Sequence, residues 1–96
     1  MSRGSIEVVA VRLSEFPRYS KVIYKKGEQL YIRSGEDDFI RGKAIQGTLE
    51  SACYKWGFYK VDNPPKFRDG QELMDNIGRF SVNHNRIASF SPNPQK

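Results

Sequence analysis

The sequence predicts one small α+β domain, with a mixed or antiparallel sheet of about four to six strands, one main helix and one short helix. Three observations lead to this expectation. Short alternating or β-branched runs recur along the chain, two stretches carry helix-capping patterns, and 96 residues are too few for a second independent core. We therefore expect residues 6–90 to form a single domain in the order β-β-β-α-β-α-β-β, between a flexible start at 1–5 and a disordered tail at 91–96.

The first predicted strand covers residues 6–13, Ile-Glu-Val-Val-Ala-Val-Arg-Leu. Its apolar residues occupy both parities, which is typical of a central strand covered on both faces. Residues 14–20 contain Pro17, which cannot belong to a central strand, so we expect a connection there.

Residues 21–33 give the clearest local pattern, two alternating runs about Gly27, which predicts a tight β-hairpin. Whether the loop is Lys26-Gly27 or Gly27-Glu28, the same side chains share a face. One predicted face carries Ile23, Leu30 and Ile32, and the other carries Val22, Tyr24, Lys26, Tyr31 and Arg33.

The main helix is predicted from a capping-box spacing at residues 34–37 and from an apolar stripe. The acidic residues 36–38 would then lie at the positive end of the helix dipole. The stripe consists of Ile45, Thr48, Leu49, Ala52, Cys53 and Trp56, and it places Leu49 and Trp56 in the core. Gly42 and Gly47 are poor helix residues, so the helix is expected to begin near Lys43, and Gly57 is expected to end it.

The second half of the chain predicts a short strand at 58–61, ended by the two prolines at 64 and 65. Residues 69–72 repeat the capping-box spacing and open a short helix that ends near Gly78. Residues 80–82 and 86–90 flank Asn-His-Asn at 83–85, which predicts a closing hairpin.

Composition narrows the functional classes. Sixteen Lys and Arg against eleven Asp and Glu give a net charge of +5, and residues 18–33 hold five bases and one acid. A local basic surface favours phosphate-bearing or acidic partners, while solubility alone also explains a charge of this size. Cys53 is the single cysteine, so a disulfide within the chain is excluded and an intracellular location, cytoplasmic or nucleoid or nuclear, is expected. No run of residues is apolar enough to predict a membrane span.

Catalytic and metal-binding motifs are sparse in this sequence. One His and one Cys, thirty-one positions apart, predict no metal site, and no cofactor motif is present. Consecutive carboxylates at 36–38 point in different directions, so dipole complementarity explains them better than a cation. His84, with Arg86 or Lys66, would suit a metal-independent ribonuclease, but a turn histidine without a catalytic role is the better interpretation.

Basic and aromatic side chains together form the strongest candidate site, because cations bind phosphates and flat rings stack on unpaired bases. The candidate nucleic-acid-binding residues are Arg18, Tyr19, Lys21, Tyr24, Lys25, Lys26, Tyr31, Arg33, Lys60, Lys66 and Arg68. Lys60, Lys66 and Arg68 form, together with Lys55, a second basic group around the two prolines. The alternative is that the second helix covers the Tyr24 and Tyr31 face, which would make both tyrosines core residues.

The leading hypothesis is a non-enzymatic nucleic-acid-binding or regulatory domain that uses the basic, tyrosine-bearing hairpin. The second is a small protein-binding module or inhibitor, with exposed aromatic and Arg side chains as anchors for an acidic partner. The third is a toxin-type ribonuclease. The sequence leaves open DNA against RNA, sequence preference and oligomeric state.

Overall fold

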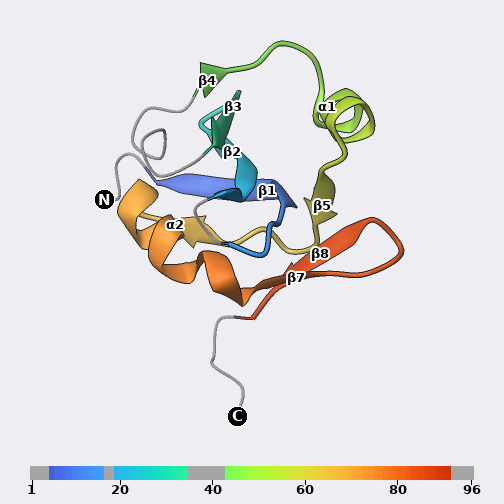
Figure 1. Cartoon of the computed structure of the whole chain (residues 1–96). Coiled ribbons are helices and arrows are strands. Elements are labelled where there is room, and N and C mark those ends of the chain that lie inside the picture. Colours follow the sequence, from blue (N-terminus) through green and yellow to red (C-terminus); the bar gives the residue numbers. More distant parts are fainter. Residues whose placement is uncertain (1–4, 17–18, 35–42, 92–96) are drawn as a thin grey trace.

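A computed structural model describes residues 5–16, 19–34 and 43–91 and contains one mixed sheet and two helices (Figure 1). In chain order the elements are β1 (Ile6–Arg12), β2 (Lys21–Lys26), β3 (Gln29–Ser34), β4 (Lys43–Ala44), α1 (Leu49–Trp56), β5 (Tyr59–Val61), β6 (Lys66–Phe67), α2 (Gly70–Asn76), the 3-10 helix η2 (Ile77–Arg79), β7 (Phe80–Val82) and β8 (Ile87–Phe90). The α+β class and the order of the longer elements are confirmed. Two short strands, β4 and β6, add to those predicted.

The sheet is built around β1. Its order is β4-β3-β2-β1-β5-β8-β7, and β6 pairs with the start of β1 while β5 pairs with its end. The predicted central position of residues 6–13 is therefore confirmed, since β1 has partners on both edges and buried residues on both faces. β5 runs parallel to β8, whereas the other pairs are antiparallel, which makes the sheet mixed.

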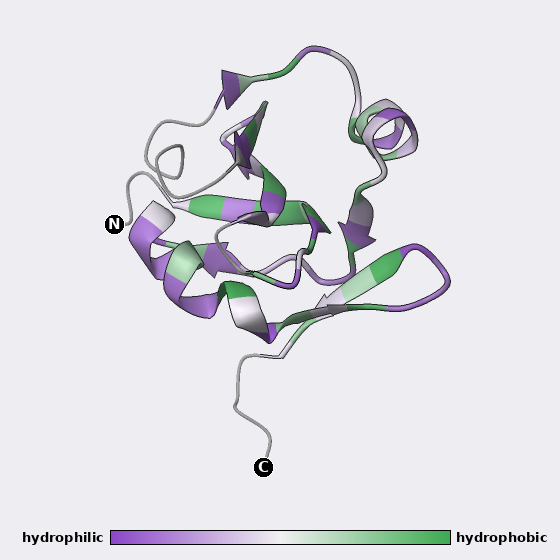
Figure 2. Ribbon diagram, in the orientation of Figure 1, coloured by the Kyte–Doolittle hydropathy of each residue, from purple (hydrophilic) through white to green (hydrophobic). Residues whose placement is uncertain are grey.

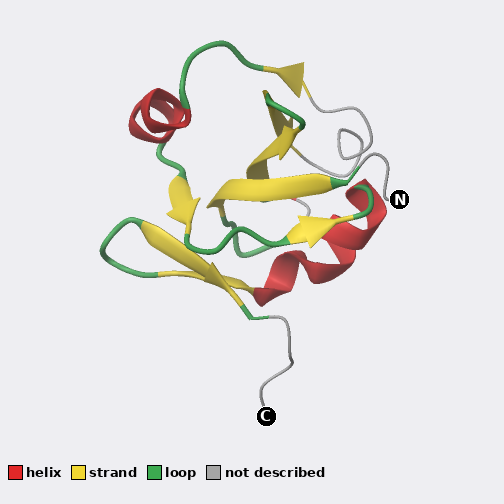
Figure 3. Cartoon of the chain, turned by 180° about the vertical axis from the view of Figure 1, so that it is seen from behind, coloured by secondary structure: helices red, strands yellow, loops and turns green. Residues whose placement is uncertain are grey.

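A β-bulge between Val8 and Ala10 determines which apolar residues of β1 reach each face of the sheet. Val8 and Val11 pack into one hydrophobic cluster, and Val9 and Ala10 pack into another. One extra residue in a strand puts two neighbouring side chains on the same face. Helices α1 and α2 lie on opposite sides of β1 (Figure 3), so we name the two faces of the sheet the α1 face and the α2 face.

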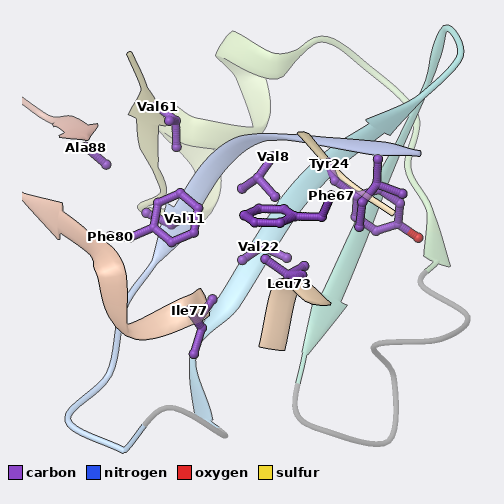
Figure 4. Packing of buried hydrophobic residues seen from close by; sticks show 11 residues of the cluster. Val8, Val11, Val22, Tyr24, Val61, Phe67, Leu73, Ile77, Phe80 and Ala88 are labelled. Carbon is purple, nitrogen blue, oxygen red and sulfur yellow. The ribbon is translucent and has the colours of Figure 1, made fainter. Parts of the chain in front are cut away.

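The hydrophobic core on the α2 face contains residues of α2 and η2, of β6, and of the strands β7 and β8. Figure 4 shows Leu73 beside Val22 and Phe67, and Ile77 belongs to the same hydrophobic cluster. The Asp69 side chain accepts a hydrogen bond from the Glu72 N–H at 3.0 Å and so caps α2, as predicted. α2 ends at Asn76, near the predicted end, and the 3-10 helix η2, which contains Gly78, follows it directly.

The α1 face is covered by a shorter helix than the sequence predicted. Residues 43 and 44 form β4, and α1 begins only at Leu49, capped by the Thr48 side chain, which accepts from the Ser51 N–H at 3.2 Å. Gly47 has a φ of 106°, which lies outside the helical range, so the helix cannot extend back to Lys43. The predicted start was wrong. The predicted end was right, because Gly57 has a φ of 75° and its N–H donates to the Cys53 carbonyl at 2.9 Å.

Trp56 is not a core residue, contrary to the prediction. Its side chain is 37% exposed at the last position of α1. Because α1 starts late and has only eight residues, its buried stripe is short and consists of Ala52 with the half-buried Leu49 and Cys53. The core of the α1 face is completed by Phe58, Ile23 and Ile45.

Several predictions fall outside the described residues, namely the flexible start apart from Ser5, the capping box and acidic run within 35–42, and the tail after Ser91. Pro17 and Arg18 also lie outside them. In the part of the chain that is described, no helix is both long and apolar enough to cross a membrane. Figure 2 shows the most apolar stretch along β1 and a hydrophilic turn between β7 and β8.

Candidate nucleic-acid interface

The hairpin forms with the predicted alternation, but its tyrosine-bearing face is buried. Gly27 and Glu28 make the two-residue loop, and Tyr24 pairs with Tyr31. Tyr24 is 2% exposed and Arg33 is 3% exposed. The Tyr24 and Tyr31 rings stack with centroids 5.3 Å apart, and the Arg33 guanidinium lies 4.7 Å from the Tyr24 ring centre.

This burial corrects the prediction that Tyr24 and Arg33 contact nucleic acid. Tyr24 belongs to the cluster with Leu73 of α2, so the second helix covers this face, which was the alternative left open by the sequence. Tyr31 is half-buried against the same cluster. A ring enclosed in a core cannot stack on a base without local unfolding.

Most bases of the sheet, Lys26 and Arg33 apart, lie instead on the α1 face. In an antiparallel pair, directly opposed residues point to the same side of the sheet. Ala10 faces α1 and pairs with Lys60, while Arg12, two residues further along β1, pairs with Lys21. At the other end of β1, Glu7 lies between Lys25 and Lys66 on the same face.

Charges are distributed differently on the opposite side of the molecule. Helix α2 carries Glu72 and Asp75 and is capped by Asp69. Arg68 is exposed, and its Nε lies 3.5 Å from the Glu72 carboxylate, so this predicted phosphate-binding cation already has an acidic neighbour. On the α1 face, by contrast, the pairing of β1 with its neighbours gathers five bases and one acid, Glu7.

A cavity of about 520 Å³ opens between α1, β5 and the turn that precedes β8. Its lining residues are Glu50, Cys53, Tyr54, Phe58, Lys60 and Arg86, and we call it the α1 cleft. The three residues from α1 are spaced i, i+3 and i+4, which places them on one side of the helix. The Lys60 amine lies 3.9 Å from the Glu50 carboxylate, and both side chains are largely exposed.

Arg86 is held in the α1 cleft by an unusual backbone. It has a φ of 62°, which for a residue other than glycine costs about 1–3 kcal/mol unless neighbouring contacts maintain it. Its Nη2 donates to the Phe58 carbonyl at 3.4 Å, and its guanidinium lies 5.0 Å from the Tyr59 ring centre. These contacts place an exposed cation beside Lys60.

Helix α1 carries two exposed aromatic rings, of which Tyr54 lines the cleft and Trp56 does not. Tyr54 is 92% exposed, and the Lys55 amine lies 5.8 Å from the centre of the half-exposed Trp56 ring. Exposed rings beside cations are the combination expected of a surface that receives unstacked bases. The sequence predicted this combination on the hairpin, whereas in the structure exposed rings and cations are neighbours on α1.

Cys53 lies at the bottom of the cleft, half-buried and in contact with the α1-face core. Burial raises the pKa of its thiol, and the negative charge of Glu50 raises it further, while Lys60 and Arg86 act in the opposite direction. A raised pKa leaves less thiolate at a given pH, so this cysteine is poorly suited to nucleophilic chemistry at neutral pH.

Alkylation of Cys53 by iodoacetamide should therefore be slower in the native protein than in urea at pH 8. Glu50→Gln removes the carboxylate that raises the pKa and should increase the native rate by about two-fold or more, because the rate follows the thiolate fraction. Lys60→Gln should change it in the opposite direction. Equal alkylation rates in the unmodified protein, Glu50→Gln and Lys60→Gln would show that these two charges do not affect the pKa of the thiol.

A second cavity, of about 280 Å³, lies where β1 ends and β2 begins. Arg12, Leu13, Ser14, Tyr19 and Lys21 line it, and we call it the basic cavity. Tyr19 is 60% exposed and contacts the exposed Phe16 ring edge-to-face, with centroids 6.1 Å apart. Tyr19 and Lys21 are thus two predicted site residues that the structure brings together.

His84 lies exposed in the turn between β7 and β8. The Asn83 side chain accepts from the Asn85 N–H at 2.9 Å, so turn formation accounts for the Asn-His-Asn pattern. Among the described residues, no three His, Cys, Asp or Glu side chains are grouped as metal ligands would be.

Of the eleven predicted site residues, Arg18 lies outside the described residues, and Tyr24, Tyr31 and Arg33 belong to the buried hairpin face. The other seven separate into groups. Tyr19 and Lys21 line the basic cavity, Lys60 lines the α1 cleft, Lys25 and Lys66 flank Glu7, and Lys26 and Arg68 are exposed elsewhere. The predicted nucleic-acid-binding residues did not include Arg12, Tyr54 or Arg86, although Arg86 was named beside His84. Arg12 is a charged residue in a mostly apolar run, and Tyr54 lies off the apolar stripe of its helix, so both carried a signal of exposure. Arg86 had none that indicated the cleft.

Comparisons with protein-family models, with curated proteins and with solved structures find no match to this chain.

Proposed function

We propose that the protein binds single-stranded nucleic acid through the α1 cleft. One observation carries the proposal: a 520 Å³ cavity has an almost fully exposed tyrosine and two exposed cations, contributed by three separate segments, at its opening. Cavities of about 300–1,000 Å³ receive groups as large as a nucleoside. Electrostatic attachment through the α1 face and stacking on Tyr54 together account for the side chains that converge there.

The base and the phosphate of a nucleotide each have a partner in this arrangement. A base can stack on Tyr54, and a phosphate can bind Lys60 and Arg86. The Lys60–Glu50 ion pair does not oppose this, because an exposed pair is worth about 0–1 kcal/mol and exchanges readily. Arg86 is oriented by the Phe58 carbonyl, which reduces the entropy lost when it binds a phosphate.

A single strand suits the cleft better than a duplex. A base enters the cavity only if it is unstacked, and duplex bases are stacked and paired already. The protein should therefore bind oligonucleotides of either sugar type as single strands, with little sequence preference, because every base has a face for stacking.

The test is fluorescence anisotropy of labelled oligonucleotides at several salt concentrations. Lys60→Gln and Arg86→Gln should each reduce the slope of log K against log salt by about 0.7. Tyr54→Ala should cost about 1–3 kcal/mol of single-strand affinity and leave that slope nearly unchanged, because no cation is lost.

Lys26→Gln is the matched control, since Lys26 is an exposed lysine near the hairpin loop and outside the cleft. Its slope should equal that of the unmodified protein. If Lys26→Gln reduced the slope and Lys60→Gln left it unchanged, the result would indicate that the hairpin, and not the α1 cleft, binds the nucleic acid. Absence of binding by the unmodified protein at low salt would refute nucleic-acid binding.

A protein partner is the second candidate, and the exposed apolar rings favour it. Phe16 is 59% exposed and Trp56 is 37% exposed, and aromatic side chains of this kind anchor protein interfaces. An interface centred on such rings need not weaken with salt, whereas phosphate binding must. Salt-resistant capture of a protein after nuclease treatment, together with no oligonucleotide binding, would favour this candidate.

A further inference from the structure

We infer that the basic cavity, formed by Arg12, Ser14, Tyr19 and Lys21 around Leu13, binds a phosphate group of the strand that enters the α1 cleft. The choice of strand rests on the proposed function. The ability to bind phosphate does not, because it follows from the cavity itself.

Two cations oppose each other directly at this cavity. Arg12 and Lys21 are register partners in the antiparallel β1–β2 pair, which puts their Cβ atoms about 4.5–5.5 Å apart on one face. Like charges in this position are destabilising, and the described residues that line the cavity include no carboxylate. An anion between them converts the repulsion into two charge-assisted contacts.

Neutral donors surround the same space. The Ser14 hydroxyl oxygen accepts from the Phe16 N–H at 3.4 Å, which leaves its hydrogen able to donate to a ligand. The Ser14 N–H donates to the buried Ser20 hydroxyl at 3.0 Å, and this hydrogen bond anchors the start of the loop between β1 and β2. The Tyr19 side chain lines the same cavity. Cations and hydroxyl donors without an acidic lining residue are the environment that a phosphate group requires.

The size and place of the cavity indicate its ligand. At about 280 Å³ it is smaller than typical nucleoside-sized sites, so a phosphate group with its water fits it better than a base. Ala10 pairs with Lys60, which makes Arg12 the diagonal neighbour of Lys60, at about 7–8 Å between Cα atoms. The backbone of about one or two nucleotides spans this distance, so one strand can reach both cavities.

The first arm of the test uses inorganic phosphate and needs no oligonucleotide. Titration followed by NMR should shift the backbone signals of Arg12 and Lys21, and Lys21→Gln or Arg12→Gln should weaken binding by about 10-fold. Lys26→Gln is the control and should bind as the unmodified protein does. Circular dichroism melts check folding, which should not suffer because each variant removes one of two opposed like charges. Equal, unsaturable shifts in all four proteins would overturn the inference.

The second arm identifies the source of the phosphate. If it belongs to the strand in the α1 cleft, Lys21→Gln and Arg12→Gln should each flatten the salt dependence of oligonucleotide binding by about 0.7. An unchanged slope, with the slope of Lys60→Gln reduced, overturns the inferred strand path and leaves the proposed function intact. Saturable phosphate binding without any oligonucleotide binding would instead refute the proposed function and assign the cavity to a small phosphorylated ligand.

Discussion

Tyr24→Ala is expected to lose about 3–5 kcal/mol of unfolding free energy. The Tyr24 ring is 2% exposed, stacks on Tyr31 and lies 4.7 Å from the Arg33 guanidinium. Truncation therefore removes a large buried side chain and leaves a cavity in the core of the α2 face (Figure 4). Small domains have about 5–15 kcal/mol of stability in total, so the loss should be obvious in urea unfolding followed by circular dichroism.

Two variants make the measurement specific. Tyr24→Phe keeps the ring and its stacking and should lose no more than about 1.5 kcal/mol. Lys26→Ala, on the same strand and face but exposed, should remain within about 0.5 kcal/mol of the unmodified protein. A loss below about 1 kcal/mol for Tyr24→Ala would mean that this face is open, which would restore the hairpin tyrosines as base-stacking candidates.

Phe58→Ala is expected to cost a similar amount, about 3–5 kcal/mol. Phe58 is 1% exposed and fills the α1-face core between Ala10, Ile23 and Ala52. It also forms one wall of the α1 cleft, so the variant should lose oligonucleotide binding along with stability.

Trp56→Ala provides the contrast, because the sequence pattern predicted Trp56 as the core aromatic of this helix. With 37% of its side chain exposed, it should cost only about 1 kcal/mol. Thermal melts of the two variants decide between the assignments, since about 1 kcal/mol corresponds to about 4–8 °C in a domain of this size. A larger loss for Trp56→Ala than for Phe58→Ala would contradict the packing of the α1 face.

The strands were predictable where a local pattern and a tertiary requirement agree. The hairpin of β2 and β3 combines alternation with a glycine turn, and the central position of β1 follows from its apolar residues on both parities. The start of α1 was missed because Ile45 and Thr48 continue the apolar spacing of the helix without being helical. Here the conformation of Gly47 overrides the periodicity.

The candidate site was only partly predictable, because it is assembled across strands. Strand parity indicated that Tyr24 and Arg33 share a face, but whether that face is open depends on where α2 packs, and no local pattern carries this information. The basic α1 face depends on the pairing of β1 with β2, β5 and β6, which brings Lys21, Arg12 and Lys60 together from three segments.

The pairing of β1 also determines when the chain can fold. One edge of β1 pairs with β2, which follows it closely in the chain. The other edge can pair only after β5 and β6 have been synthesised, and β5 in turn pairs with the parallel strand β8. Pairing over such separations is slow because loop closure precedes any gain from contacts. A nascent chain that has reached only residue 58 therefore exposes an unpaired, apolar strand edge, and we expect chain synthesis to be the period of greatest risk of aggregation.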